Sequence, residues 1–528
     1  MDPVKITIDG REVTTAKGKT VIQAAADAGI LIPHYCYHPK LPIAGNCRMC
    51  LVEIEKMPKL QIACNTQVAE GMAVLTGSPK VLAARKAVME FLLINHPLDC
   101  PICDQAGECW LQDYYMKHDL QPSRFAERKE HERKREIFGP NVVFDGERCI
   151  KCTRCVRFLQ EVTGTGELTV VNRGDRSTIA LFPGTVLDNP FSANVNDLCP
   201  VGALTDRDFR FKVRVWYLQK TPSICPGCST GCNVSVESYQ NRIARFKPRV
   251  NEEVNSYWLC DEGRYCFHEL TEGERLTGPL VRQEGGLAPA TWEEALQVVL
   301  RGLRAVPALA GILSGRNTNE EAFLFARLMR RIAPGASLAV AYRERTLDAV
   351  QKILMSPDRS PNFRGARDMG VDSDGAFDGL LRRLCDGAFG AAYVVGEEPE
   401  RYGDAGAIRA ALERLSFLVV QDTRMTETAR LAHVVLPATH FGEKEGTYTN
   451  RRGRVQKLNP AVVPPPGALP DSEIFRRLLE RAGEKASFRA PAEIFAAIAA
   501  EVPAYRGLTY EKIGERGIPL SETEARGA

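Results

Sequence analysis

The chain lacks the marks of a membrane, secreted or nucleic-acid-binding protein. No apolar run approaches the roughly 18 residues that suggest a membrane span. The first residues, MDPVKITIDGREV, include no apolar segment behind a basic start, so no secretory signal is visible. A net charge of +3 gives no electrostatic basis for binding nucleic acid. We therefore expect a soluble or peripheral protein of the cytoplasm.

Common nucleotide-binding and catalytic signatures are also missing. There is no P-loop, and the glycines at 164 and 166 are not followed by the third glycine of a dinucleotide-binding loop. No nucleophile stands with a base in a recognisable pattern. We expect that the chain itself binds neither a nicotinamide dinucleotide nor a flavin, and we assign no catalytic residue.

Cysteine, by contrast, is abundant. Seventeen cysteines occur in 528 residues, a length that predicts several domains. A disulfide framework is typical of small secreted chains, whereas this chain is large and shows no signal, so metal ligation is favoured. Sixteen cysteines precede position 267 and only Cys385 follows it. The two halves are therefore different kinds of domain.

The first ligand set is Cys36, Cys47, Cys50 and Cys64. Ahead of it, VKITI, Asp9-Gly10 and REVTT predict a β-hairpin, and Thr20 caps a short helix, VIQAAADA, that stops at Gly29. Strands, one helix and thiols in a loop suit a small ferredoxin-like β-grasp domain. The spacing differs from the plant-type ferredoxin pattern, so it indicates four thiolates without fixing the metal. A zinc site is equally compatible with it.

The second set is His96, Cys100, Cys103 and Cys109, in HPLDCPICDQAGEC. The three cysteines are a strong metal signal but one ligand short. A lone histidine is most often structural, yet this one stands four residues before Cys100, where it can reach the same metal. Exchanging a thiolate for imidazole makes a site less negative, which favours its reduced form.

The third set is Cys149, Cys152 and Cys155, in CIKCTRC, with Cys199 in DLCPVGAL. A C-x2-C-x2-C triplet with a remote Cys-Pro is the bacterial ferredoxin signature, in which the triplet surrounds three corners of a cubane and the distant cysteine the fourth. Zinc sites rarely use this triplet. We predict one cubane here, because a second such triplet is absent. Three basic residues within the set are candidates for tuning its potential, with solvated surface charge as an equal alternative: Lys151, Arg154 and Arg157.

The fourth set is Cys225, Cys228 and Cys232, in CPGCSTGC, with Cys260 in YWLCDEGR. These are again four thiolates, the complement of a cubane. Cys266 competes with Cys260 as the last ligand, and we prefer Cys260. Cys385 lies in an apolar, helix-like run and is expected to be a buried thiol.

The cysteine-poor half alternates strand and helix patterns from about residue 278. Thr291 and Glu294 form a capping box that opens a helix, LAGILSG and SFLVVQD are strand-like, and NTNEEAFLFARLMRRIA and AGAIRAALERL are helical. This alternation predicts α/β layers. The mixed-sign stretch from Arg124 to Glu136 predicts a solvated helical linker, with a docking surface as the alternative.

About half of the sequence resembles a known family, the large iron–sulfur G subunit (75 kDa type) of bacterial NADH:quinone oxidoreductase, respiratory complex I. The resemblance is carried by PHYCYHPKLPIAGNCRMCLVE, INHPLDCPICDQAGECWLQD, CIKCTRCVRF with NDLCPVGAL, and CPGCSTGCN with WLCDEGR. It implies a [2Fe–2S] cluster at the first set and a [4Fe–4S] cluster at each of the others. A second resemblance, of QDTRMTETARLAHVVLPATHFGEKEGTYTNRRGRVQ, is to the molybdopterin oxidoreductases.

The resemblances imply an α+β multidomain fold. The expected domains are a β-grasp [2Fe–2S] domain at 1–80, a His-ligated [4Fe–4S] domain at 81–120, a bacterial-ferredoxin-like [4Fe–4S] domain at 121–218, a [4Fe–4S] domain at 219–275 and a truncated molybdopterin-oxidoreductase-like α/β domain at 276–528. No molybdenum ligand is apparent in the last of these, so we expect a scaffold without molybdopterin.

The family also implies a role and partners. Such a chain is a subunit of a proton-translocating enzyme and carries electrons, whereas the NADH and quinone sites belong to other subunits. Its expected partners are a flavin- and NADH-binding subunit and quinone-side iron–sulfur subunits, with membrane contact only through the complex, on the cytoplasmic side of the inner membrane. Electrons would enter at the first set and pass by the third to the second, with the fourth on a side branch.

Three other functions remain in competition. The catalytic subunit of an NAD-linked formate dehydrogenase shares the cluster-bearing half, but it needs a molybdenum or tungsten ligand and a longer catalytic half. An iron-only hydrogenase needs active-site cysteines after position 270, where only Cys385 occurs. A zinc-bound scaffold is compatible with four-ligand sites in general, although the triplet of the third set disfavours it.

Overall fold

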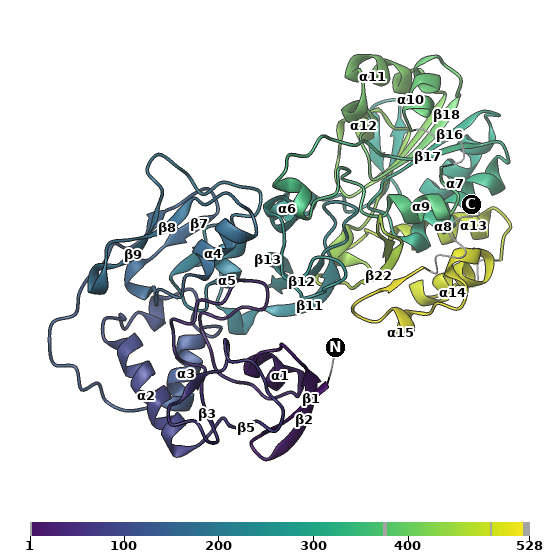
Figure 1. The fold of residues 1–528 in the computed structure, drawn as a ribbon. Helices are drawn as coiled ribbons and strands as arrows, with labels where there is room; N and C mark the ends of the chain where they lie inside the picture. Colours follow the sequence, from purple (N-terminus) through teal and green to yellow (C-terminus); the bar gives the residue numbers. More distant parts are fainter. Residues whose placement is uncertain (1–2, 373–376, 486–487, 521–528) are drawn as a thin grey trace. The chain divides into compact units, whose positions relative to one another are not determined.

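The structure is a computed structural model that describes residues 3–372, 377–485 and 488–520. The chain divides into two compact units, Met1–Leu218 and Gln219–Ala528. Figure 1 shows the short strands and loops of the first unit and the broad sheet of the second. Within the described residues, no helix is both long and apolar enough to cross a membrane.

The first unit begins with the predicted hairpin. Strand β1 (Pro3–Ile8) pairs antiparallel with β2 (Arg11–Ala16), and the turn residues Asp9 and Gly10 both have positive φ angles, 49° and 79°. Such angles are what a two-residue hairpin turn requires. The sheet has the order β2-β1-β5-β3-β4, in which β1 and β5 run parallel. Its other strands are β3 (Leu51–Ile54), β4 (Gln61–Ile62) and β5 (Ala73–Leu75).

The predicted helix of this domain is confirmed as α1 (Val21–Asp27). Its preceding residue, Thr20, donates its backbone N–H to Oε1 of Gln23 at 2.9 Å, which satisfies one group at the helix start. The chain leaves the helix through Gly29, whose φ of 72° favours glycine. The apolar face of α1 packs on the sheet in one core, which also includes Cys50 and Cys64. These two cysteines of the first set therefore lie close to this helix.

The rest of the first unit consists of short elements joined by long loops. Its helices are α2 (Pro79–Leu93), α3 (Trp110–His118), α4 (Arg154–Glu161) and α5 (Asn194–Leu198), with short 3-10 turns at Cys100–Ile102, Gly146–Arg148, Gly174–Arg176 and Val215–Tyr217. A three-stranded sheet contains β6 (Glu136–Ile137), β7 (Val142–Phe144) and β10 (Leu204–Asp206), and β8 (Leu168–Val171) pairs with β9 (Thr178–Leu181). The cysteines of the second and third sets lie where these elements begin and end.

The prediction of a helical linker from Arg124 to Glu136 is wrong. Residues 124–135 form no helix, and the segment ends in β6. Its charges find specific partners: Lys129 donates to the backbone oxygen of His96 at 2.8 Å, and Lys134 pairs with Asp99 at 2.6 Å. The segment does not form a helix, because charged side chains such as Lys129 and Lys134 bind groups that are distant in sequence.

The second unit opens with an antiparallel sheet, β11 (Gln219–Ile224), β12 (Asn233–Tyr239) and β13 (Arg242–Pro248), followed by α6 (Asp261–Thr271). A seven-stranded sheet follows, in the order β15-β14-β20-β19-β18-β16-β17. Strands β16 to β20 are mutually parallel. Strands β14 and β15 add an antiparallel pair at the β20 side of the sheet. The bounds are β14 (Leu280–Gln283), β15 (Gly286–Pro289), β16 (Leu309–Leu313), β17 (Ser337–Val340), β18 (Ala391–Val395), β19 (Phe417–Asp422) and β20 (Val434–Pro437).

Helices cover both faces of this sheet, as the strand–helix alternation predicted. Along β16, Leu309 and Leu313 belong to one apolar core, whereas Ala310 and Ile312 belong to another, as the two-residue period of a strand requires. The first core includes residues of α7 (Trp292–Arg304), α8 (Asn319–Ile332), α9 (Phe363–Asp368), α13 (Asp471–Arg481) and α14 (Pro491–Glu501); the second includes residues of α10 (Phe377–Cys385), α11 (Ala405–Glu413) and α12 (Glu427–Leu431). A small sheet of β21 (Gly446–Thr449), β22 (Arg454–Leu458) and β23 (Ile518–Pro519) lies with α15 (Tyr510–Ile513). Cys385, expected to be buried, is only half-buried, because it is the last residue of α10 and lies at the edge of the core.

Candidate metal centres

The third set lines a small and mostly apolar cavity. Its four thiols line one small cavity together with Phe144, Ile179 and Leu204. Left-handed backbone at Lys151 and Thr153, with φ of 55° and 60°, lets the triplet turn around this space before α4 begins. Burial raises the pKa of each thiol in the set, that of Cys199 to about 12. Thiols in such a place become thiolates when metal charge offsets the burial, so the donor set fits a cubane.

The first set brings its four thiols together in the loops around α1. The backbone N–H of Cys36 donates to Sγ of Cys47 at 3.4 Å, and the thiols of Cys50 and Cys64 hydrogen-bond to each other. Cys36, Cys50 and Cys64 are at most 1% exposed, while Cys47 is half-buried. The contact with Cys47 lowers the pKa of Cys36 against the effect of burial. Two close pairs of nearly buried thiols are a donor set that suits a small iron–sulfur cluster.

The second set is the most exposed. Cys100 is exposed, Cys103 is buried, and Cys109 is the half-buried residue before α3; their thiols interact electrostatically. His96 starts the same loop, and burial, with the charges of Lys129 and Arg148, lowers the pKa of its imidazole to about 4. A neutral imidazole is the form that binds metal.

Glycine at 202 makes room for the second set. A Cβ atom at Gly202 would lie 2.3 Å from Sγ of Cys103, so any larger residue there would displace the thiol. The guanidinium of Arg148 also faces Cys103, and it pairs with Asp99 at 2.8 Å. The sequence pattern predicts the ligands but does not point to these neighbouring residues. The one signal in the sequence is that Arg148 immediately precedes Cys149.

The fourth set lies in the second unit, between β11, β12 and α6. Its four thiols line one small cavity together with Gly263, Arg345 and Met355. A Cβ atom at Gly263 would lie 3.0 Å from Sγ of Cys225 and 3.1 Å from Sγ of Cys260, so glycine leaves this space open. Cys266 interacts with Cys225 and donates its thiol to the Gly263 carbonyl at 3.2 Å. The cavity favours Cys260 as the fourth donor.

The three sets of the first unit adjoin one another. The side chain of Asn46, beside Cys47, donates to the Lys151 carbonyl at 3.2 Å and links the first and third loops. The backbone N–H of Trp110, beside Cys109, donates to the Pro200 carbonyl at 3.0 Å and links the second and third. His34 stacks edge-on against Trp110, with centroids 5.5 Å apart, and links the first and second. Ligand loops that are distant in sequence, by 105 residues for Asn46 and Lys151, thus form one cluster of sites. Across the residues that the structure covers, no three His, Cys, Asp or Glu side chains are grouped to hold a single metal ion.

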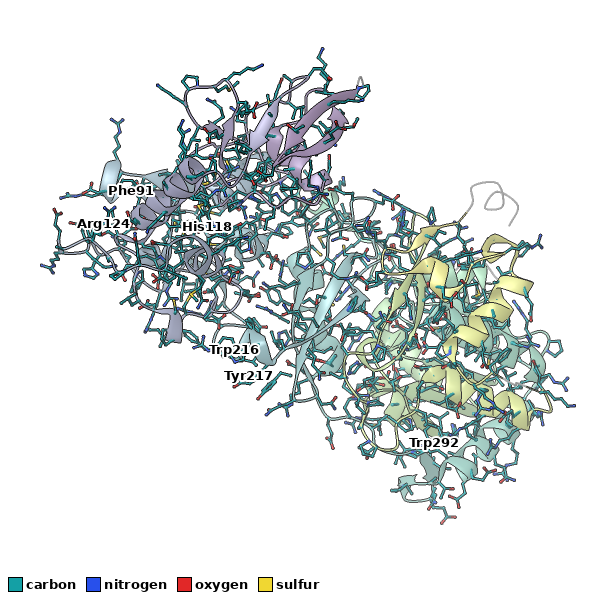
Figure 2. All side chains as sticks on the ribbon, turned by 90° about the horizontal axis from the view of Figure 1, so that it is seen from below. Phe91, His118, Arg124, Trp216, Tyr217 and Trp292 are labelled. Atoms are coloured by element: carbon teal, nitrogen blue, oxygen red, sulfur yellow. The ribbon has the colours of Figure 1, made fainter. Side chains whose placement is uncertain are left out.

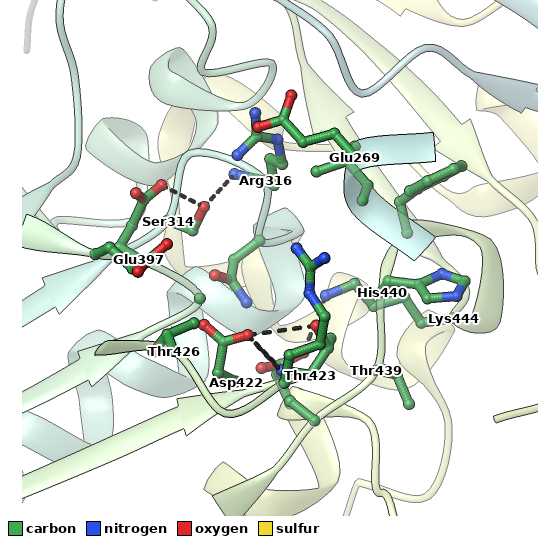
Figure 3. Close-up of a pocket in the computed structure, with 18 of the residues that line it drawn as sticks. Glu269, Ser314, Arg316, Glu397, Asp422, Thr423, Thr426, Thr439, His440 and Lys444 are labelled. Carbon is green, nitrogen blue, oxygen red and sulfur yellow. Dashed lines mark hydrogen bonds and ion pairs between the residues drawn. The ribbon is translucent and has the colours of Figure 1, made fainter. Parts of the chain in front are cut away.

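The second unit has a polar pocket at the carboxyl ends of parallel strands β16, β18 and β19, the usual position of ligand sites in such sheets. Its volume is about 130 Å³, below the roughly 300–1,000 Å³ of typical ligand pockets. Figure 3 shows Ser314 donating to Glu397, at 2.8 Å, and Asp422 accepting from backbone N–H groups. Burial raises the pKa of Glu397, and it raises that of Asp422 to about 6. The pocket is small, and its carboxylates, Glu397 and Asp422, already accept hydrogen bonds from other residues of this chain.

The fold and the four donor sets define an iron–sulfur protein with ferredoxin-type domains ahead of a molybdopterin-oxidoreductase-type domain. Sequence models of known families match in the same order. These are a 2Fe-2S iron-sulfur cluster binding domain at residues 1–79, the NADH-ubiquinone oxidoreductase-G iron-sulfur binding region at 85–124, the NADH-quinone oxidoreductase subunit 3 ferredoxin-like domain at 139–205, the molybdopterin oxidoreductase Fe4S4 domain at 218–271 and molybdopterin oxidoreductase at 275–343 and 336–481.

Curated relatives narrow this class. The G subunit of NADH-quinone oxidoreductase from Rickettsia conorii is 41% identical over 358 residues, which are 66% of this chain and 52% of the relative. The NADH-ubiquinone oxidoreductase 78 kDa subunit of Neurospora crassa mitochondria is 48% identical over 296 residues, 56% of this chain and 39% of the relative. The chain belongs to this family of NADH-quinone oxidoreductase G subunits, as its sequence motifs predicted. It spans about half the length of the curated relatives that it matches.

A solved structure, of an NAD+-reducing [NiFe]-hydrogenase in the H2-reduced state, is 28% identical, with a TM-score of 0.37 over 40% of this chain and 91% of that one.

Proposed function

We propose that this chain relays single electrons through bound iron–sulfur clusters as a subunit of NADH:quinone oxidoreductase. The proposed ligands are Cys36, Cys47, Cys50 and Cys64 for a [2Fe–2S] cluster; His96, Cys100, Cys103 and Cys109; Cys149, Cys152, Cys155 and Cys199; and Cys225, Cys228, Cys232 and Cys260, each for a [4Fe–4S] cluster. The observation that carries the proposal is the direct contact between the loops of the first three sets.

Iron–sulfur clusters supply one-electron chemistry when they are bound, and the chain supplies spacing, burial and charge around them. The short contacts of Asn46, Trp110 and His34 hold the three donor sets of the first unit within one folded body. Apolar walls line the cavity of the third set, and three of its four thiols are buried. The fourth set belongs to the other compact unit, which supports its role as a side branch of the relay.

The surface around the second set supports electron exit to a partner. Leu98 is 94% exposed and Ile102 56%, both within the ligand loop, and Trp216 and Tyr217 are 58% and 59% exposed. Figure 2 labels the two aromatic residues. They adjoin the second set, because Arg214 donates to the Cys103 carbonyl at 2.7 Å and a Cβ atom at Gly107 would lie 3.0 Å from the Trp216 ring. Exposed apolar and aromatic side chains are typical of protein interfaces.

We assign this surface to a quinone-side iron–sulfur subunit, and we place the flavin subunit at the first set. The whole assembly would carry the chain at the cytoplasmic face of the membrane. The order of transfer is the first set, then the third, then the second.

Anaerobic purification of the chain, with counts of iron, sulfide, zinc and molybdenum and EPR after dithionite reduction, tests the proposal. We expect iron and sulfide for one [2Fe–2S] and three [4Fe–4S] clusters and the EPR signals of both types. A colourless chain that contains zinc and gives no EPR signal would overturn it. Stoichiometric molybdenum would instead indicate a formate-dehydrogenase type of subunit.

A further inference from the structure

One buried guanidinium touches the loops of all three sets in the first unit. Arg154, the first residue of α4, is 3% exposed. Its Nη1 donates to the Leu198 carbonyl at 3.3 Å, its Nη2 donates to the Tyr37 carbonyl, and its Cζ lies 4.7 Å from the centroid of the Trp110 ring. Each contacted residue immediately adjoins a proposed ligand, respectively Cys199, Cys36 and Cys109. Arg154 itself stands between Cys152 and Cys155.

This charge has no carboxylate counter-ion among the described residues. Its partners are carbonyl groups and an aromatic ring, and its Nε is buried without a hydrogen-bond partner. Burial lowers the pKa of Arg154, while thiolates at Cys152, Cys199 and Cys36 act in the opposite direction. An isolated buried charge is costly unless an opposite charge lies nearby. Clusters with thiolate ligands carry net negative charge, so they are the natural counter-ions.

The two other basic residues of the same stretch differ from Arg154 in burial. Lys151 is 31% exposed and pairs with Glu132 at 2.9 Å, so solvent and a counter-ion screen its charge. Arg157 is half-buried and donates to the carbonyls of Cys36, at 2.6 Å, and Cys152, at 3.2 Å. The three residues therefore form a graded series at one site, from screened to fully buried.

We propose that Arg154 is a positioning residue that compensates the charge of the clusters at the first and third sets together and raises the reduction potentials of both. The inference rests on the proposed electron relay. Reduction adds negative charge to a cluster, and a fixed positive charge in a water-poor site favours that state. Because one guanidinium serves both sites, its removal lowers both potentials in the same direction. The cluster at the second set, which Arg154 reaches only through Trp110, shifts less.

Redox titration of the cluster-loaded chain, followed by EPR, tests this inference with R154Q and with K151Q as the matched control. For R154Q we expect the ratio of reduced to oxidised cluster at a fixed potential to fall about tenfold at both sites, which is 59 mV for a one-electron couple. For K151Q we expect less than about a twofold change, as for other exposed ion pairs. Unchanged potentials in a fully loaded R154Q chain would overturn the inference.

A third variant decides the case in which R154Q does not retain its clusters. R154K keeps the charge but loses the fork that spans two carbonyls. Clusters retained in R154K and lost in R154Q support charge compensation. Loss of clusters from both variants would show that the hydrogen-bonded fork, and not the charge, is what the site needs, and would overturn the inference. Absence of clusters from the unmodified chain is a different result, which would refute the proposed function itself.

Discussion

The two units of this chain position their polar groups by different means. In the first unit, short strands and helices end in long loops, and contacts such as that of Arg154 with the Tyr37 and Leu198 carbonyls hold those loops together. In the second, parallel strands with an apolar core on each face place Ser314, Glu397 and Asp422 together at the carboxyl ends of neighbouring strands. The first unit thus relies on contacts between loops to bring its donor sets together, whereas the second has an apolar core on each face of its main sheet. The following tests probe that difference.

The largest expected effect is loss of a cluster from the first unit. C152S removes one donor of the third set, whose cavity offers apolar neighbours and no spare thiol. We expect the iron content to fall by the amount held in one [4Fe–4S] cluster, and electron transfer through the assembled complex to stop. C228S, the matched variant in the fourth set, should lose the same amount of iron but retain most NADH:quinone activity. Equal activity loss in both variants would contradict the side-branch placement of the fourth set.

Sequence reasoning worked well where local pattern decides structure. The hairpin turn at Asp9-Gly10, the helix start at Thr291 and the α/β alternation were predicted, because turn residues, caps and apolar periodicity act over a few residues. The segment from Arg124 to Glu136 was mispredicted, since its charges are paired with residues such as Asp99 that are distant in sequence.

The candidate sites divide in the same way. Cysteine spacing predicts the donors of each set, and the structure brings the thiols of each set together. Spacing could not show that the three sets adjoin, because the contacts that join them link residues distant in sequence, such as Asn46 and Lys151, which are 105 residues apart. Nor could it distinguish the buried Arg154 from the screened Lys151, which have the same charge in the same motif.

In the second unit, we expect substitution within a buried group of three charged side chains to reduce folding stability most. Lys444 pairs with Glu321 at 2.8 Å and with Asp471 at 2.9 Å, and all three side chains are at most 6% exposed. Although burial opposes it, these carboxylates raise the pKa of Lys444. K444M leaves two buried carboxylates without a cation, so we expect about 3–5 kcal/mol of destabilisation.

Denaturant unfolding of the second unit, followed by circular dichroism, measures the K444M effect. The control is the triple variant K444M/E321Q/D471N, which removes all three charges and should recover much of the loss. Iron content of the first three sets should stay unchanged in both. Loss of those clusters in K444M would show that the two units are not independent.

A smaller effect in the same unit depends on pH. Burial raises the pKa of Glu443, but hydrogen bonds from His440 and Arg275 outweigh it and lower the pKa to about 2. Because the pKa of Glu443 is lower in the folded chain than in the unfolded chain, where it is near 4.3, ionised Glu443 stabilises the fold at any pH above that unfolded value. This stabilisation is lost as the pH falls toward 2. The contribution is on the order of 3 kcal/mol.

An acid titration of R275Q against the unmodified chain, followed by tryptophan fluorescence, checks this. Arg275 contacts Glu443 at 2.7 Å, so R275Q should bring the acid midpoint to a higher pH and reduce stability at neutral pH. Its control is R409Q, whose exposed pair with Glu413 should leave the midpoint in place. A midpoint that moves equally in both variants would mean that overall charge, and not this contact, sets acid stability.

The smallest expected effect is at the start of α1, beside the first set. Thr20 donates its backbone N–H to Gln23 and its hydroxyl to the same oxygen, at 2.9 and 3.1 Å. T20A keeps the backbone bond but removes the hydroxyl, which should destabilise the first unit by about 1 kcal/mol. T20S retains the hydroxyl and should behave almost as the unmodified chain.

Because the loops of the first set lie around this helix, cluster loading gives a second readout. If the donor set supplies most of the stability of the β-grasp domain, T20A should lower the unfolding midpoint of the iron-free chain and leave the loaded chain nearly unchanged, since a bound group stabilises only the folded state. An equal decrease in both forms would instead mean that the β-grasp domain, like the second unit, is stable through its own packing, and the contrast between the two units would then be one of geometry alone.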